Sequence, residues 1–204
     1  MIKRVSFSVI AMALAFSAAA DDAASLKQKL GHLNAVSADF QQTVTDVNDK
    51  QIQQGEGVIA LAAPNRLYWH LTSPDESMIV ADGKDVWIYN PFAEEVTVMG
   101  IDEVIAASPM ALLVQQDDKV WQDYNVTQNG DCYQIKPKSL DSQVVGVDVC
   151  FNGEQLSQFS ILDNQGNTSL FKLRGQRALE AGDNSLFKFT VPQNVDVDDQ
   201  RAGE

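Results

Sequence analysis

The sequence predicts an α+β domain that consists mainly of antiparallel β-sheet. Near the start, apolar residues recur at spacings of three and four, at Leu26, Leu30, Leu33 and Val36, which is typical of one amphipathic helix. From about residue 38 onward, short runs rich in β-branched and aromatic residues alternate with polar turn signals. No repeat, low-complexity segment or linker divides the chain, so we expect a single domain over 21–204.

Turn signals such as Asn48-Asp49, Pro64-Asn65 and Asp82-Gly83 separate the expected strands. We expect strands over 38–47, 51–62, 66–71, 76–81, 86–89, 121–128, 132–138, 144–151, 155–162, 168–174 and 186–191. A second helical stretch is expected over 102–116, with a stop and restart at Ser108-Pro109, because Ser caps helix starts and Pro suits the first turn.

Residues 1–20 have the pattern of a secretory signal peptide. Lys3 and Arg4 precede a short apolar run, and small residues up to Ala20 suit cleavage before the mature chain. The run is too short for a lasting membrane anchor, and the first cysteine is Cys132, so no acylated N-terminal cysteine is available. We expect an exported protein that is released into the compartment it reaches.

The charge of the chain excludes several partners. Cleavage after Ala20 removes two cations and takes the net charge from −13 to −15. Nucleic acid binding needs clustered Lys and Arg, which this chain lacks, and an acidic protein is repelled by anionic lipid surfaces. We therefore expect no nucleic acid partner and no stable membrane insertion.

The two cysteines fit a single strand register. A hairpin centred on Asp141 places Cys132 opposite Cys150, and a lone cysteine pair in an oxidising compartment usually forms a disulfide. The same register gathers four apolar side chains on one face: Tyr133, Ile135, Val147 and Val149. We expect a structural disulfide, because no CxxC motif or flanking cation favours redox activity.

No catalytic constellation is present in the sequence. It contains no HExxH, GxSxG, GxGxxG or phosphate-binding loop, and His32 and His70 are far apart. We therefore expect a binding protein rather than an enzyme, with no cofactor and no metal.

One hairpin carries more apolar surface than one sheet face needs. In 66–71, Leu67, Trp69 and Leu71 alternate with polar or amphipathic residues, whereas the hairpin over 78–89 is apolar on both faces. Such a sheet is either covered on both sides as ordinary core or keeps one side for an apolar ligand. The residues alone leave both readings open.

An ordered string of motifs resembles the LolA family of periplasmic outer-membrane lipoprotein carriers, over essentially the whole mature chain. The motifs are Asn65-Arg66-Leu67-Tyr68-Trp69-His70, Pro74-Asp75-Glu76-Ser77, Asp82-Gly83-Lys84, Trp87-Ile88-Tyr89-Asn90-Pro91-Phe92, Ser108-Pro109 and Val197-Asp198-Asp199-Gln200-Arg201.

The resemblance implies an unclosed β-barrel whose hydrophobic cavity is capped by an α-helical lid. Such carriers accept acylated lipoproteins from the inner-membrane LolCDE transporter, shield the acyl chains and deliver them to the outer-membrane receptor LolB; we expect a monomer. By position in the family pattern, the candidates for cavity and lid contacts are Leu30, Val44, Leu67, Trp69, Ile79, Met110 and Leu113.

One position departs from the family pattern. The family often has an Arg immediately before this Pro, thought to hold the lid shut, but here Ala63 precedes Pro64. Arg66 should point away from the face that Leu67 and Trp69 share, so we expect the lid to be held differently or more loosely. A lipocalin-like binder, a periplasmic enzyme and an assembly protein are the competing interpretations; the GxW motif typical of lipocalins is absent.

Overall fold

One curved sheet dominates the protein. The computed structural model describes residues 18–33, 35–107, 109–115, 117–139 and 142–201, and within these ranges twelve strands form a sheet in the order β12-β6-β5-β4-β3-β2-β1-β11-β10-β9-β8-β7. Sequential neighbours pair antiparallel, and β12 joins β6 in parallel. The signal peptide prediction falls largely on residues 1–17, outside the described ranges.

The strands are β1 (Ala35–Thr45), β2 (Gln51–Ala62), β3 (Arg66–Ser73), β4 (Ser77–Asp82), β5 (Asp85–Asn90), β6 (Glu95–Gly100), β7 (Tyr124–Asn129), β8 (Cys132–Pro137), β9 (Val144–Asn152), β10 (Gln155–Asp163), β11 (Thr168–Ala178) and β12 (Asp196–Asp199). The helices are α1 (Ala18–His32), α2 (Ile101–Ala107) and α3 (Asp118–Trp121), with 3₁₀ helices η1 (Pro109–Leu113) and η2 (Ala181–Phe187).

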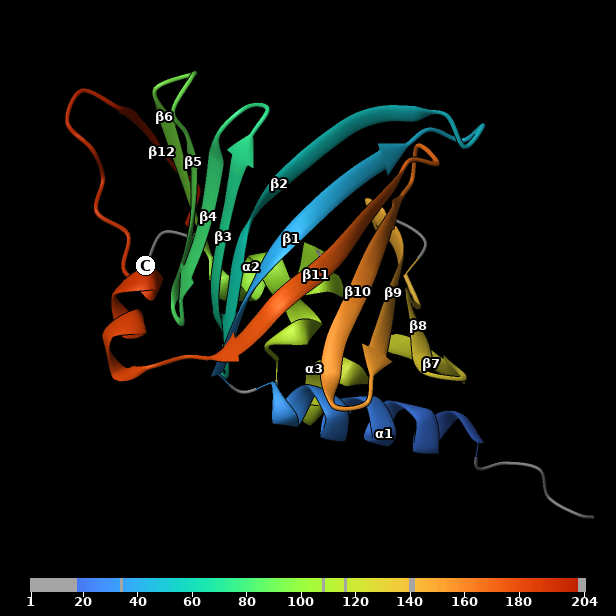
Figure 1. Ribbon diagram of the computed structural model, residues 1–204. Helices are drawn as coiled ribbons and strands as arrows, with labels where there is room; N and C mark the ends of the chain where they lie inside the picture. Colours follow the sequence, from blue (N-terminus) through green and yellow to red (C-terminus); the bar gives the residue numbers. More distant parts are fainter. Residues whose placement is uncertain (1–17, 34, 108, 116, 140–141, 202–204) are drawn as a thin grey trace, which may run out of the picture.

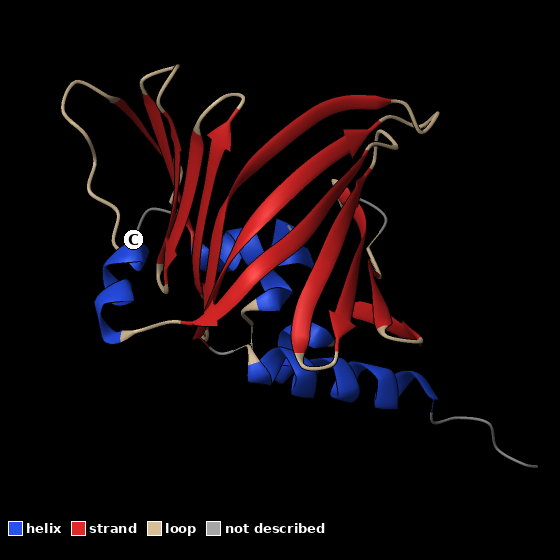
Figure 2. Cartoon of the chain, viewed as in Figure 1, coloured by secondary structure: helices blue, strands red, loops and turns tan. Residues whose placement is uncertain are grey.

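The sheet bends without closing into a barrel. β12 and β7 end the strand order and do not pair with each other. α2 and α3 lie in the hollow of the curve, and α1 runs across its lower end, past the β9–β10 turn (Figure 1). η2 lies on the outer side of the sheet (Figure 2). The predicted fold class, an unclosed, mainly antiparallel sheet with helices over its concave side, is confirmed.

Ten of the predicted strands are present, although their ends shift by up to four residues. The sequence did not reveal β6 or β12. The strand expected over 186–191 is wrong, because η2 runs to Phe187 and residues 188–191 pair with no strand. Trp121, expected to open a strand, ends α3 instead. The expected helical restart is the 3₁₀ helix η1, and Ser108 lies outside the described residues.

The hairpin of β4 and β5 is covered on both faces, as its apolar sequence requires. On the concave side Ile79 packs against the main core. On the convex side the ring of Phe189 stacks on Trp87 at 5.6 Å and lies 5.9 Å from Tyr89. The C-terminal segment therefore shields the outer face of the sheet, while the helices shield the inner one.

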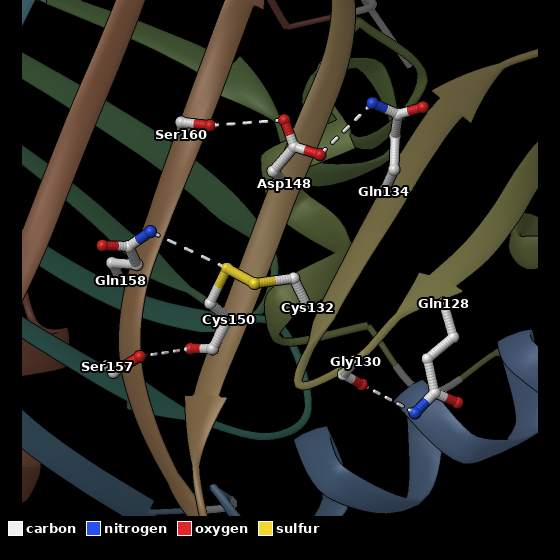
Figure 3. Close-up of a disulfide and its surroundings, with 9 residues drawn as sticks. All are labelled: Gln128, Gly130, Cys132, Gln134, Asp148, Cys150, Ser157, Gln158 and Ser160. Atoms are coloured by element: carbon white, nitrogen blue, oxygen red, sulfur yellow. Dashed lines mark hydrogen bonds between the residues drawn. A yellow bond between two sulfur atoms is a disulfide. The ribbon is translucent and has the colours of Figure 1, made fainter.

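The β8–β9 hairpin has the register that the sequence predicts. Cys132 pairs with Cys150, Tyr133 with Val149 and Ile135 with Val147. The cysteines form a disulfide on the convex face, where Gln158 donates to the Cys150 sulfur (Figure 3). The four apolar side chains on the opposite face are at most 1% exposed. One register therefore satisfies both the core and the cross-link.

We expect the Cys132→Ser/Cys150→Ser variant to lose about 3 kcal/mol of unfolding free energy, because the disulfide limits the entropy of the unfolded chain. Urea denaturation followed by circular dichroism measures the change. Dithiothreitol should lower the midpoint of the wild type to that of the variant and leave the variant unaffected. A wild-type midpoint that does not respond to full reduction would contradict a stabilising disulfide.

Candidate functional site

Four aromatic rings line the deepest part of the concave face. Phe40 of β1 stacks on Trp69 of β3, with centroids 4.1 Å apart, and Phe171 of β11 meets Trp69 edge-on at 4.8 Å. Phe159 of β10 stacks on Phe171 at 4.6 Å. All four are buried. Because strands from both halves of the sheet contribute, the rings form a continuous apolar floor across its middle.

A glycine makes room for this floor. A Cβ atom on Gly57 of β2 would lie 2.0 Å from the carbonyl oxygen of His70 and 2.7 Å from the Cζ atom of Phe40. Neither contact is sterically allowed, and the first partner is backbone. Gly57 therefore lets β3 approach β2 closely while the Phe40 ring lies across the β2 backbone.

Apolar side chains of two helices fill the hollow above the aromatic floor. They come from α1 and from the η1 segment, all are at most 8% exposed, and all belong to the same core cluster: Leu26, Leu30, Leu33, Leu112, Leu113 and Val114. The helices thus form a lid whose own side chains occupy the concave side of the sheet.

Helix α1 is fastened to the β7–β10 part of the sheet along its length. The hydroxyls of Ser25 and Tyr133 share a 2.8 Å hydrogen bond, and the Lys29 ammonium donates to the Gly153 carbonyl at 3.1 Å. The His32 ring contacts the Glu154 carboxylate and, by hydrogen bonding it, holds the pKa of that carboxyl below its usual value. These bonds tie α1 to strands it covers.

The η1 segment is held by different contacts. The backbone N–H of Asn65, in the β2–β3 turn, donates to the Val114 carbonyl at 3.1 Å. Lys27 of α1 forms an ion pair with Asp118 at the start of α3, which joins the lid elements to each other. The lid is therefore fastened to the β2–β3 turn through backbone atoms.

Ala63 and Arg66 lie as the alternation predicts. Ala63 lines a cavity of about 170 Å³ between α1 and η1, shared with Leu30 and Leu113. Arg66 is on the opposite face, where it donates to the Asn184 side chain at 3.3 Å and its guanidinium lies over the Phe187 ring. Arg66 therefore holds η2 and takes no part in fastening the lid.

Two open clefts flank α2, and Asn65 and Asp102 line both of them. One, of about 1000 Å³, lies between the β4–β5 turn, the start of α2 and Arg201. The other, of about 970 Å³, reaches from Met99 of β6 to Tyr124 of β7, across the gap where the barrel does not close. The α2–η1–α3 segment therefore bridges the two ends of the sheet.

The structure brings most of the predicted cavity residues together. Leu30, Trp69 and Leu113 are in the core cluster, and Leu67 and Ile79 pack against it while partly buried. Val44 lies outside that cluster, further along β1, paired with Ser169 and Gln53. The side chain of Met110 lies outside the described residues.

Sequence reasoning missed three of the aromatic residues that form the floor: Phe40, Phe159 and Phe171. Each lies in a strand that was expected, so alternation within the strand was a usable signal. The stack itself depends on β1 pairing with β11, which joins distant parts of the chain.

In the described ranges there is no group of three or more His, Cys, Asp or Glu residues arranged to hold a metal ion. No helix in the same ranges is long and apolar enough to cross a bilayer.

Comparisons with known proteins assign this arrangement to a family. The family described as outer membrane lipoprotein carrier protein LolA matches residues 31–190. The chain belongs to the LolA family. An outer-membrane lipoprotein carrier protein from Shewanella loihica is 57% identical over 203 residues, covering 98% of each chain. Another from Shewanella sp. (strain MR-7) is 56% identical with the same coverage. A solved LolA superfamily protein from Nitrosomonas europaea aligns with 82% of this chain and 98% of its own, at 9% identity and a TM-score of 0.48.

We expect Gly57→Ala to lower the unfolding free energy of this LolA family member by at least about 2 kcal/mol, because the added methyl forces β2 from β3 and displaces the Phe40 ring. Urea denaturation measures the loss. Gly182→Ala, at a position with open space around it, is the matched control and should be nearly neutral. Equal effects of the two substitutions would rule out the proposed role of Gly57.

We expect Lys27→Met to loosen the lid with little global effect. An exposed ion pair contributes less than about 1 kcal/mol to stability. Its loss should therefore accelerate amide exchange over 111–115 and in α3 by about two- to fivefold. Hydrogen exchange with mass spectrometry measures it. Lys29→Met, which removes a cation that bonds the sheet instead, is the control and should leave α3 unchanged. Matching exchange profiles for the two variants would contradict a link between α1 and α3.

Proposed function

We propose that this protein is a chaperone, not an enzyme, that carries acylated lipoproteins by burying their acyl chains on the aromatic floor of the concave face. One observation carries the proposal: the apolar floor is covered by helices that bridge an unclosed barrel, rather than by further strands. A covering segment of this kind can move aside and leave the sheet intact. The names of the Shewanella relatives agree with this function.

Cargo would replace the lid side chains rather than fill an empty cavity. Each buried methylene group contributes roughly 0.8 kcal/mol, and the displaced leucines lose a comparable amount of burial. The net binding free energy is then the difference between the burial gained by the acyl chains and the burial lost by the displaced leucines. A carrier needs this property, because it must both take up its cargo and release it.

The location and route follow from the same proposal. Residues 1–20 would direct export and be removed, leaving 21–204 as one carrier domain in the periplasm. There it would receive lipoproteins from the inner-membrane LolCDE transporter and pass them to the outer-membrane receptor LolB. The net charge of −15 after cleavage keeps such a carrier away from anionic membrane surfaces during transit.

The experiment is release of lipoproteins from spheroplasts that contain an active transporter, with the purified mature chain added outside. We expect lipoproteins to appear in the supernatant in complex with the carrier, and Leu67→Glu to reduce this at least tenfold because it puts a charge beside the aromatic floor. Thr72→Glu, on the same strand but exposed, is the control and should release lipoproteins normally.

Two outcomes would contradict the proposal. The first is no release by the wild type when a known carrier succeeds in the same preparation. The second is binding of free fatty acids without release of any lipoprotein, which would favour a lipocalin-like binder of small apolar ligands. Circular dichroism of Leu67→Glu shows whether it has folded, so that unfolding is not mistaken for a loss of binding.

A further inference from the structure

The described contacts of the C-terminal motif Val197–Arg201 do not include the aromatic floor, and the carrier function assigns the motif no role. β12 adds to the edge of the sheet beside β6, and the Gln200 N–H donates to the Val98 carbonyl at 2.8 Å. The motif therefore ends next to the point where β6 passes into α2. Its last residue, Arg201, lines the same cleft as Ile101.

Arg201 is held by two carboxylates and an indole ring. Its Nη1 atom lies 3.2 Å from Oδ2 of Asp85, its Nε donates to Asp199 at 2.8 Å, and its guanidinium lies over the Trp87 ring. The hydrogen bonds from Arg201 lower the pKa of Asp199 to about 2. Asp85 is 8% exposed, so without Arg201 its carboxylate would be buried beside no cation that the structure describes.

Asp85 belongs to a tight turn that touches the lid. The Asp82 carboxylate accepts the backbone N–H groups of Lys84 and Asp85, both at 2.9 Å, and the Trp87 indole N–H at 3.4 Å. The carbonyl of Lys84, in the same turn, accepts the backbone N–H of Ile101 at 3.0 Å. Ile101 is the first residue of α2, so this turn fixes the position at which the lid segment begins.

The segment 101–114 is thus fastened at both ends through backbone atoms. At its start Ile101 bonds the Lys84 carbonyl, and at its end the Val114 carbonyl bonds Asn65. From this geometry we propose that Arg201 is a positioning residue: through Asp85 it holds the 82–85 turn as the pivot on which the α2–η1 lid segment opens. The role rests on the proposed carrier function, but the pivot can be measured on the free protein.

Opening at the pivot changes the apparent affinity for cargo. A protein that binds only when open loses affinity in proportion to the rarity of its open state. When the 82–85 turn is less firmly held, the open state is more populated, so cargo binds more tightly and dissociates less readily. Arg201 therefore adjusts the balance between uptake and handover without touching the acyl chain.

The first test is hydrogen exchange of the free mature protein. We expect Arg201→Gln to accelerate exchange at Ile101 and over 109–115 by roughly two- to tenfold, the range for a partly buried ion pair, with β8 and β9 unchanged. Asp85→Asn should act similarly, and the double variant no more strongly than either single change. Arg201→Lys should restore part of the protection.

The matched control is Arg177→Gln, which removes the 2.7 Å ion pair with Asp183 of η2 and breaks no described bond of the 82–85 turn. It should not alter exchange over 101–115. Two exchange results overturn the proposed role of Arg201. One is exchange over 101–115 that is unchanged in Arg201→Gln. The other is exchange that rises equally in every strand, because Arg201 would then stabilise the whole fold and not the 82–85 turn in particular.

Cargo handling is the second readout. Lipoproteins loaded on Arg201→Gln should transfer to receptor-containing membranes several-fold more slowly than from the wild type. Normal transfer, despite faster exchange over 101–115, also overturns the role in handover. If the wild type releases no lipoprotein but Arg201→Gln accelerates exchange over 101–115, the carrier function is contradicted and the role of the turn as pivot is supported. If the wild type releases lipoprotein but exchange in Arg201→Gln is unchanged, only the role of the turn as pivot is contradicted.

Discussion

A sheet with apolar side chains on both faces is stable in water only if both faces are covered, and this constraint shapes the whole molecule. The convex side is covered by the C-terminal segment, where Phe187 packs against Ala60 and Ala62, and Phe189 stacks on Trp87. The concave side is covered by helices whose apolar side chains pack into the main core. The two covers therefore differ in size: the convex one adds a small apolar cluster, and the concave one fills the hollow of the sheet.

The lid itself divides into two unequal parts. Helix α1 bonds the β7–β10 part of the sheet through Ser25, Lys29 and His32. The α2–η1 segment instead spans from β6 to β7 across the unclosed side, and its described hydrogen bonds to the sheet lie near its two ends, at Ile101, Glu103 and Val114. In the proposed carrier, movement of the second part opens the gap between the ends of the sheet while α1 keeps its bonds to the sheet. Among the described strands none closes this gap, so the lid segment spans it instead.

The sequence revealed the parts of this structure that depend on local patterns. The register of the β8–β9 hairpin followed from its turn and from alternation, because a slip of one residue would expose Tyr133 and Ile135. β12 was not foreseen, since its four residues are all exposed and it exists only because β6 offers an edge. The segment after η2 reads as a strand because Phe187 and Phe189 alternate, but it lies against the sheet face and pairs with no edge. The bond between Asn65 and Val114 joins backbone atoms, which no residue type signals.

The family resemblance leads us to expect an Arg where this chain has Ala63, and Ala63 itself offers no polar side chain to hold the lid. Six buried lid side chains contribute on the order of 10 kcal/mol of burial, and a fatty acyl chain of about 15 methylene groups contributes roughly 12 kcal/mol. Because these two terms oppose each other, hydrogen bonds of about 1 kcal/mol each contribute to the balance between closed and loaded forms. In this protein those bonds are made by Asn65, Lys84 and the Lys27–Asp118 pair. The apolar residues thus give the site its capacity, and the few polar contacts around the lid hold its closed form.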